Sequence, residues 1–148
     1  MQVAYRVAEV PGKGRGLVLE QPVAQYALIW DFHTANLQLF NERGVRDELA
    51  RRQADGTVVE FLTSTYRSQG VFVFPGGDDG HYFNHSNTPN VALGEVLSAQ
   101  GAPGEFDPRC TYALRDLQAG EELLDDYNTY GACRAGRRKK KKEEEEEE

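Results

Sequence analysis

Two stretches of the chain decide its fold: residues 84–90, which read NHSNTPN, and residues 115–127, which read RDLQAGEELLDDY. Taken alone, the first stretch is typical of a loop whose Asn and Ser side chains bond nearby backbone, because it is too rich in Asn, Ser and Pro for a helix. The second stretch, taken alone, is typical of a hairpin that turns at Gly120. A glycine turn at residues 12–16, which read GKGRG, precedes both. Because glycine lets a ligand approach the backbone closely, this turn is a candidate binding segment.

Two common kinds of site explain these stretches poorly. The glycine turn reads G-x-G-x-G, whereas a dinucleotide-binding turn reads G-x-G-x-x-G and opens a long helix. His81 and His85 lie four residues apart, as helical zinc-binding histidines do, but no Glu follows His81 and the segment does not favour a helix. The sequence therefore predicts neither a Rossmann site nor a metal site.

Short apolar runs separated by Gly and Pro predict a mainly β fold of the α+β type. One helical segment is predicted over residues 37–53, where four apolar residues share a face, and Gly56 ends it. The predicted strands are residues 3–7, 17–19, 27–32, 57–62, 71–74, 91–97 and 110–114.

The charge of the chain is concentrated in its first 136 residues. The formal net charge is −7, but residues 137–148 hold six basic and six acidic groups that cancel. Residues 1–136 therefore carry 11 basic and 18 acidic groups. An acidic body repels phosphate backbones, so it argues against direct binding of nucleic acid and favours a basic peptide or protein as partner.

The cysteines, the apolar runs and the composition indicate the cellular compartment and the domain organisation. Cys110 and Cys133 cannot form a disulfide framework and lack zinc-type spacing. No apolar run is long enough to span a bilayer, and the N-terminus lacks a secretory core, so we expect a soluble intracellular protein that is not bound to membranes. Residues 132–148 have almost no apolar side chains, so we expect one domain at residues 1–131 and a charged, disordered tail. The sequence does not indicate an oligomeric state.

The three motifs together resemble those of the SET-domain family of protein lysine methyltransferases. That family carries a G-x-G turn, then N-H-S-x-x-P-N, then G-E-E-L and D-Y, in the order found here at residues 14–16, 84–90, 120–123 and 126–127. The resemblance covers residues 1–131 and lacks the cysteine cluster that follows the domain in many members. It implies a fold of short strands with one helical insert and a threaded C-terminal segment that brings Asn84 and His85 beside Tyr127.

The resemblance also implies a cofactor, a substrate class and residue roles. S-adenosyl-L-methionine is the implied cofactor, and a lysine of a basic, histone-like protein is the implied substrate. Lysine has a pKa of about 10.4 and is mostly charged at neutral pH. A desolvating channel would therefore favour the neutral amine that accepts a methyl group. Tyr127 is the implied catalytic residue, Tyr130 and Asp125 are candidate channel residues, and the implied cofactor contacts are Gly14, Arg15, Gly16, Asn84 and His85.

Asp125 departs from the family pattern, which often has an aromatic residue at this position. An inward carboxylate would favour the charged form of the substrate lysine and oppose methyl transfer. We therefore expect Asp125 to face solvent or to guide a basic substrate. Two functions stay open on these grounds: an active lysine methyltransferase, and a catalytically weak binding module for basic peptides that keeps the fold.

Overall fold

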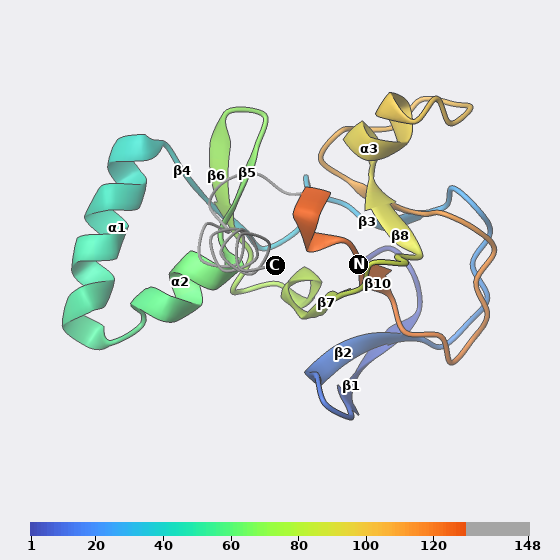
Figure 1. The fold of residues 1–148 in the computed structure, drawn as a ribbon, viewed down its shortest axis with the longest axis horizontal. Helices are drawn as coiled ribbons and strands as arrows, with labels where there is room; N and C mark the ends of the chain where they lie inside the picture. Colours follow the sequence, from blue (N-terminus) through green and yellow to red (C-terminus); the bar gives the residue numbers. More distant parts are fainter. Residues whose placement is uncertain (130–148) are drawn as a thin grey trace, which may run out of the picture. The chain divides into compact units, whose positions relative to one another are not determined.

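The computed structural model describes residues 1–129, which form two compact units. The first unit comprises residues 1–35 and 78–129, and the second comprises residues 36–77. Most elements of residues 1–129 are short strands in small sheets (Figure 1), which confirms the predicted mainly β class. Tyr130 and the predicted tail at residues 132–148 lie outside the described residues, so the domain boundary stays a prediction.

The first unit contains three small sheets. An antiparallel hairpin pairs β1 with β2, a three-stranded antiparallel sheet has the order β3-β9-β8, and a two-stranded parallel sheet joins β7 to β10. Its elements are β1 (Tyr5–Val10), β2 (Gly14–Leu19), β3 (Leu28–Trp30), η1 (Asp79–Tyr82), β7 (Asn84–His85), β8 (Val91–Leu93), α3 (Gly94–Ala99), β9 (Thr111–Ala113), β10 (Leu124–Asp125) and η2 (Tyr127–Thr129).

The second half of β2 lies in the core of the first unit because both of its edges are paired. One edge pairs with β1, and the other bonds the segment before β10: the Leu19 amide donates to Glu121 O at 2.9 Å, and the Leu123 amide donates to Leu17 O at 2.8 Å. Leu17, Leu19 and Leu123 are fully buried. This pairing fixes the C-terminal segment beside the glycine turn.

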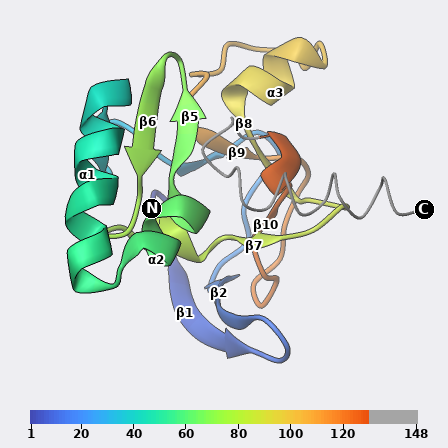
Figure 2. The same cartoon turned by 60° about the vertical axis from the view of Figure 1, so that its left-hand side comes forward.

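The second unit packs two helices against a three-stranded antiparallel sheet of order β4-β6-β5. Asn41 caps the first helix, because its side chain accepts the Gly44 amide at 2.8 Å, and Gly56 ends that helix in the left-handed conformation at φ 78°. Val45, Phe61 and Phe74 form the buried core. The elements, cyan to green in Figures 1 and 2, are β4 (Gln38–Phe40), α1 (Glu42–Asp55), α2 (Val58–Ser64), β5 (Tyr66–Ser68) and β6 (Val71–Phe74).

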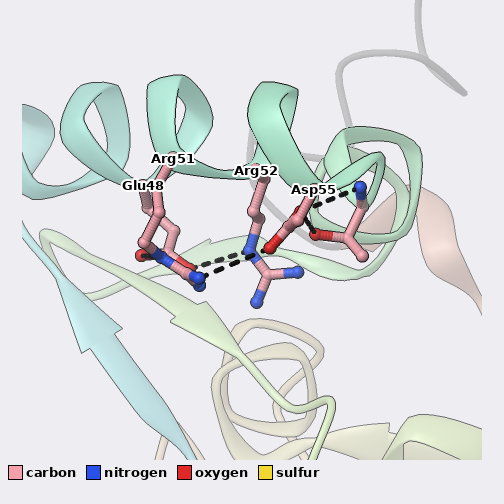
Figure 3. A network of polar contacts seen from close by, with 5 residues as sticks. Glu48, Arg51, Arg52 and Asp55 are labelled. Carbon is pink, nitrogen blue, oxygen red and sulfur yellow. Dashed lines mark hydrogen bonds and ion pairs between the residues drawn. The ribbon is translucent and has the colours of Figure 1, made fainter.

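A charged network lies along α1 (Figure 3). Glu48 accepts hydrogen bonds from Arg51 and from Arg52, whose Nε lies 2.8 Å from Glu48 Oε1. The Arg52 guanidinium lies 5.0 Å from the ring centroid of Phe61 and 4.6 Å from that of Phe74, and only 8% of Arg52 is exposed. Paired with Glu48 and stacked on two rings, the buried arginine forms part of the core of the second unit.

Two predicted strands are wrong in whole or in part. Residues 57–62 belong largely to α2, where the helical period buries Phe61 completely and leaves Val59 72% exposed. The strand predicted at residues 91–97 ends at Leu93, and α3 follows. The backbone turns there because the Gly94 amide donates to Cys110 O at 2.8 Å, in a place where a Cβ would lie 2.0 Å from Asp107 O.

The predicted helix begins later than its apolar pattern suggests. Residues 38–40 form β4, and α1 starts only at Glu42, after its Asn41 cap.

The strand β5 had no counterpart among the predicted elements. Within residues 1–129, no helix combines the length and apolarity needed to cross a bilayer.

Candidate active site

The parallel pair of β7 and β10 organises the candidate site. Leu124 pairs with Asn84 and Asp125 pairs with His85, and the Ser86 amide donates to Asp125 O at 2.9 Å. Figure 2 shows the two strands side by side. Because parallel strands run in step, the residues that follow β10 lie beside those that follow β7. Tyr127, two residues after β10, donates its amide to His85 of β7. This confirms that the C-terminal segment brings the Asn84-His85 pair next to Tyr127.

Asn90, the last residue of the 84–90 stretch, also binds the C-terminal segment at residues 122–124. Its Nδ2 donates to Glu122 O at 2.8 Å, and its Oδ1 accepts the Leu124 amide at 2.8 Å. Only 5% of Asn90 is exposed. The side-chain amide therefore acts as a short strand partner, and the last Asn of the NHSNTPN stretch has a structural role.

His85 and Tyr127 contact each other directly. The Tyr127 amide donates to His85 Nδ1 at 3.0 Å, and the two ring centroids lie 5.2 Å apart. Since Nδ1 accepts, the neutral ring carries its proton on Nε2, which lies 3.1 Å from Asn87 Oδ1. The Tyr127 hydroxyl donates to Phe83 O. Both ends of the tyrosine are thus held by residues beside or within β7.

A second cluster joins the glycine turn to Asn84. Asn84 Nδ2 donates to Arg15 O at 3.1 Å and to Glu122 Oε2 at 2.6 Å. A Cβ placed on Gly16 would lie 2.5 Å from Glu122 Oε2 and 2.8 Å from Asn84 Nδ2. A side chain at position 16 would force Glu122 or Asn84 to shift, so Gly16 allows these two residues to pack closely against the turn. By contrast, Gly14 has φ 81° with nothing within 4 Å of an added Cβ, which leaves that backbone open.

Charged groups surround this cluster. Lys13 Nζ lies 3.7 Å from Glu122 Oε1, and the Lys13 side chain is 41% exposed. The Arg15 side chain is 61% exposed, lies 3.8 Å from Glu9 Oε1, and reaches Tyr82 OH at 3.5 Å. The cluster therefore presents carbonyl and carboxylate acceptors next to two exposed cations, a combination that suits a zwitterionic ligand.

Hydrogen bonds to η1 position the chain that enters β7. The Tyr5 hydroxyl donates to Asp79 Oδ2 at 2.5 Å, and Trp30 Nε1 donates to Asp78 Oδ2 at 2.8 Å. The bond to Asp79, together with burial, raises the pKa of Tyr5 to about 12. β1 and β3 thereby hold η1 in place immediately before Asn84.

Of the two candidate channel residues, the structure describes Asp125 and not Tyr130. Asp125 is 1% exposed on the paired strand β10, so the expectation that it faces solvent is wrong. A buried carboxylate cannot guide a substrate from the surface, and its place in a lysine channel stays a prediction. Tyr130, the other candidate, lies outside the described residues.

The sequence reasoning missed three contributors to the site. Glu122 bonds Asn84, Lys13 pairs with Glu122, and the Phe83 carbonyl holds Tyr127. The second Glu of the GEEL motif is a signal that could have identified Glu122. The contact itself depends on an isolated bridge between Val18 and Glu122, which local sequence does not reveal.

This arrangement of glycine turn, Asn-His strand and tyrosine is that of a SET domain, and the comparisons agree. Residues 14–128 match the SET domain family, so the chain belongs to that family. Similar proteins include the H3 lysine-36 specific histone-lysine N-methyltransferases of Aspergillus oryzae, 28% identical over 128 residues, and of Emericella nidulans, 27% identical over 128 residues. Both alignments cover 85% of this chain and 12% of the relative, so the chain spans only a small part of their length.

A solved structure supports the fold independently. The crystal structure of a candidate histone methyltransferase from Plasmodium falciparum aligns with a TM-score of 0.51 and 16% sequence identity. The alignment covers 86% of this chain and 95% of that one. The SET fold predicted from the three motifs is thereby confirmed.

Proposed function

We propose that this chain is a protein-lysine N-methyltransferase that uses S-adenosyl-L-methionine. The observation that carries the proposal is the contact of Tyr127 with His85 and Phe83, beside the junction of Asn84 with the glycine turn. A candidate catalytic tyrosine and a candidate cofactor-binding turn thus meet at the same short strand. A scaffold without catalytic function has no need for this combination.

The residues at the glycine turn fit the amino-acid end of this cofactor. Its ammonium needs acceptors, which the Arg15 carbonyl and the Glu122 carboxylate provide. Its carboxylate needs donors, which the exposed Lys13 and Arg15 side chains provide. We propose that Gly14, Arg15, Gly16, Asn84 and His85 bind the cofactor. The contacts of Glu122 with Asn84 and with Lys13 lead us to propose these two residues as well.

Tyr127 would act at the substrate amine. The bound cofactor supplies a methyl group from its sulfonium centre. Because the Tyr127 hydroxyl donates its proton to Phe83 O, its oxygen lone pairs are available to accept an N–H of the lysine amine. The tyrosine ring, fixed against His85, would exclude water and favour the neutral amine.

The acidic body favours a lysine in a basic protein segment as substrate. Residues 1–136 carry 18 acidic and 11 basic groups. The names of the fungal relatives make histone tails the first segments to test. We propose a basic protein segment as the substrate class and no direct contact with nucleic acid.

The test combines binding and turnover. Purified chain is incubated with methyl-labelled S-adenosylmethionine and an array of basic peptides, while calorimetry measures cofactor binding. We expect Tyr127→Phe to lose at least about 100-fold of the transfer rate and to keep cofactor binding. Tyr26→Phe is the matched control, because Tyr26 packs on Phe106 away from these contacts, and it should retain the wild-type rate.

Two outcomes contradict the proposal in different ways. Cofactor binding without transfer, in wild type and in Tyr127→Phe alike, would identify a binding module for basic peptides. If the wild type did not bind the cofactor at all, both functions would be wrong.

A further inference from the structure

A second cluster of reactive side chains lies where β3 ends and β9 begins. The two strands are antiparallel, and Trp30 pairs with Thr111. The residues after Trp30 and those before Thr111 therefore share one end of the sheet. Asp31 and His33 come from the first segment, and Asp107 and Cys110 come from the second.

The ligand atoms of this cluster lie close enough together to share one metal ion, and one of their separations is that of zinc ligands. One ligand atom from each of Asp31, His33 and Cys110 lies within 4.8 Å of the other two. Cys110 Sγ lies 3.5 Å from Asp31 Oδ1. A tetrahedral zinc ion with bonds of about 2.3 Å to sulfur and about 2.0 Å to oxygen separates those two ligand atoms by about 3.5 Å.

Asp107 orients the histidine from outside the trio. Its Oδ2 lies 2.7 Å from His33 Nε2, and its Oδ1 accepts the Arg109 amide at 2.9 Å. A carboxylate that holds one imidazole nitrogen fixes the ring and leaves the other nitrogen for a metal. Asp107 therefore suits the role of a positioning residue.

The burial and the charge of this cluster are also suitable for binding a metal cation. Cys110 is 3% exposed, whereas the His33 side chain is 55% exposed, so the cluster runs from the core to the surface. The Arg109 guanidinium is directed over the Phe32 ring, 5.2 Å from its centroid. Two carboxylates and a potential thiolate thus outweigh the nearby positive charge.

We propose that Asp31, His33 and Cys110 bind one divalent transition-metal ion of the zinc class, with Asp107 fixing His33. Mixed carboxylate, imidazole and thiolate ligands select such ions over Mg²⁺ or Ca²⁺. Three protein ligands leave a fourth position for water. Binding requires the thiolate, so Cys110 releases its proton to solvent as the metal–sulfur bond forms.

No sequence motif indicated this site. The absence of paired cysteine spacing predicted no metal, but Asp31 and Cys110 are far apart in the chain and meet only through strand pairing. The proposal is independent of methyl transfer, because none of these residues contacts the Asn84, His85 or Tyr127 cluster through a described hydrogen bond.

The experiment titrates the full chain with Zn²⁺, in competition with a chromophoric chelator, and with Co²⁺, whose absorption reports thiolate ligation. We expect one ion per chain and a cobalt–thiolate band that disappears in Cys110→Ser. His33→Ala and Asp31→Asn should lower Zn²⁺ affinity by at least about 10-fold, and Asp107→Asn by about 10- to 100-fold. His33 is exposed, so its variant tests the site even if Cys110→Ser fails to fold.

His81→Ala and Cys133→Ser are the matched controls and should bind as the wild type does. The proposal is overturned if no thiolate band forms, or if the band depends on Cys133 and not on Cys110. Unchanged Zn²⁺ affinity in His33→Ala and Asp31→Asn would overturn it as well.

Discussion

At the scale of single residues, Gly16 is packed closely against two other residues of the candidate site. We expect Gly16→Ala to weaken cofactor binding by about 10-fold or more, because its Cβ would lie 2.5 Å from Glu122 Oε2 and 2.8 Å from Asn84 Nδ2. Gly12→Ala is the control: Gly12 has φ 77° with open space around it, so the change costs about 1 kcal/mol of backbone strain and spares the site. Calorimetry of both variants separates crowding from strain. Equal affinity in the two would argue against the assigned packing role.

Tyr5 makes stability depend on alkaline pH. Its pKa rises from an ordinary value of 10.0 to about 12, through the bond to Asp79 and burial, so the folded state holds the proton more tightly than the unfolded state. The resulting stabilisation is complete below about pH 10 and is lost as pH rises from about 10 to about 12. We expect the difference in unfolding free energy between wild type and Tyr5→Phe, measured in urea, to shrink across that range. A difference that stays constant over it would contradict the assignment.

The residue contacts show what sequence can and cannot predict. The resemblance to the SET-domain family implied that Asn84 and His85 lie beside Tyr127, and the hydrogen bond from the Tyr127 amide to His85 confirms the contact with His85. The roles of Glu122 and of the Phe83 carbonyl could not be predicted. A backbone carbonyl has no sequence signature, and the Glu122 contact requires pairing between β2 and a segment about a hundred residues later.

At the scale of elements, Arg52 and Arg51 of α1 provide a matched pair. Arg52 is 8% exposed and stacks on Phe61 and Phe74, whereas the Arg51 side chain is 60% exposed, although both bond Glu48. We expect Arg52→Ala to lower the unfolding free energy by about 2 kcal/mol, because it removes the ring contacts and leaves Glu48 short of a partner. Arg51→Ala should cost far less, since solvent screens an exposed pair.

Chemical denaturation measures the unfolding free energy of the two variants, and hydrogen exchange measures the local protection of α1. Local protection of the helix should fall in Arg52→Ala and change little in Arg51→Ala. If both variants lost protection equally, the aromatic contacts of Arg52 would have no special role.

Element types were predictable where pattern and context agree. The strands at β1, β2, β3, β6 and β9 follow from short apolar runs between turns. Residues 57–62 failed because β-branched residues favour strands locally, while the burial of Phe61 in the core of the second unit favours a helix. The hairpin typical of residues 115–127 also does not form, because β10 pairs in parallel with β7. Tertiary contacts decide both outcomes: core packing in the first case and strand pairing in the second.

At the scale of the whole molecule, the charge of residues 1–136 bears on substrate choice, provided that the proposed function holds. Complementary charge acts mainly on encounter and weakens as salt screens it. We expect the KM for a basic peptide to rise several-fold between about 0.05 M and about 0.5 M salt, with kcat nearly constant. A peptide with the same target lysine, but with its other basic residues replaced by Gln, should show a weaker salt dependence. Initial rates with labelled cofactor at saturating concentration measure both peptides. Equal salt dependence of the two would show that the acidic body does not select the substrate, and the residues near Tyr127 would then have to supply the specificity.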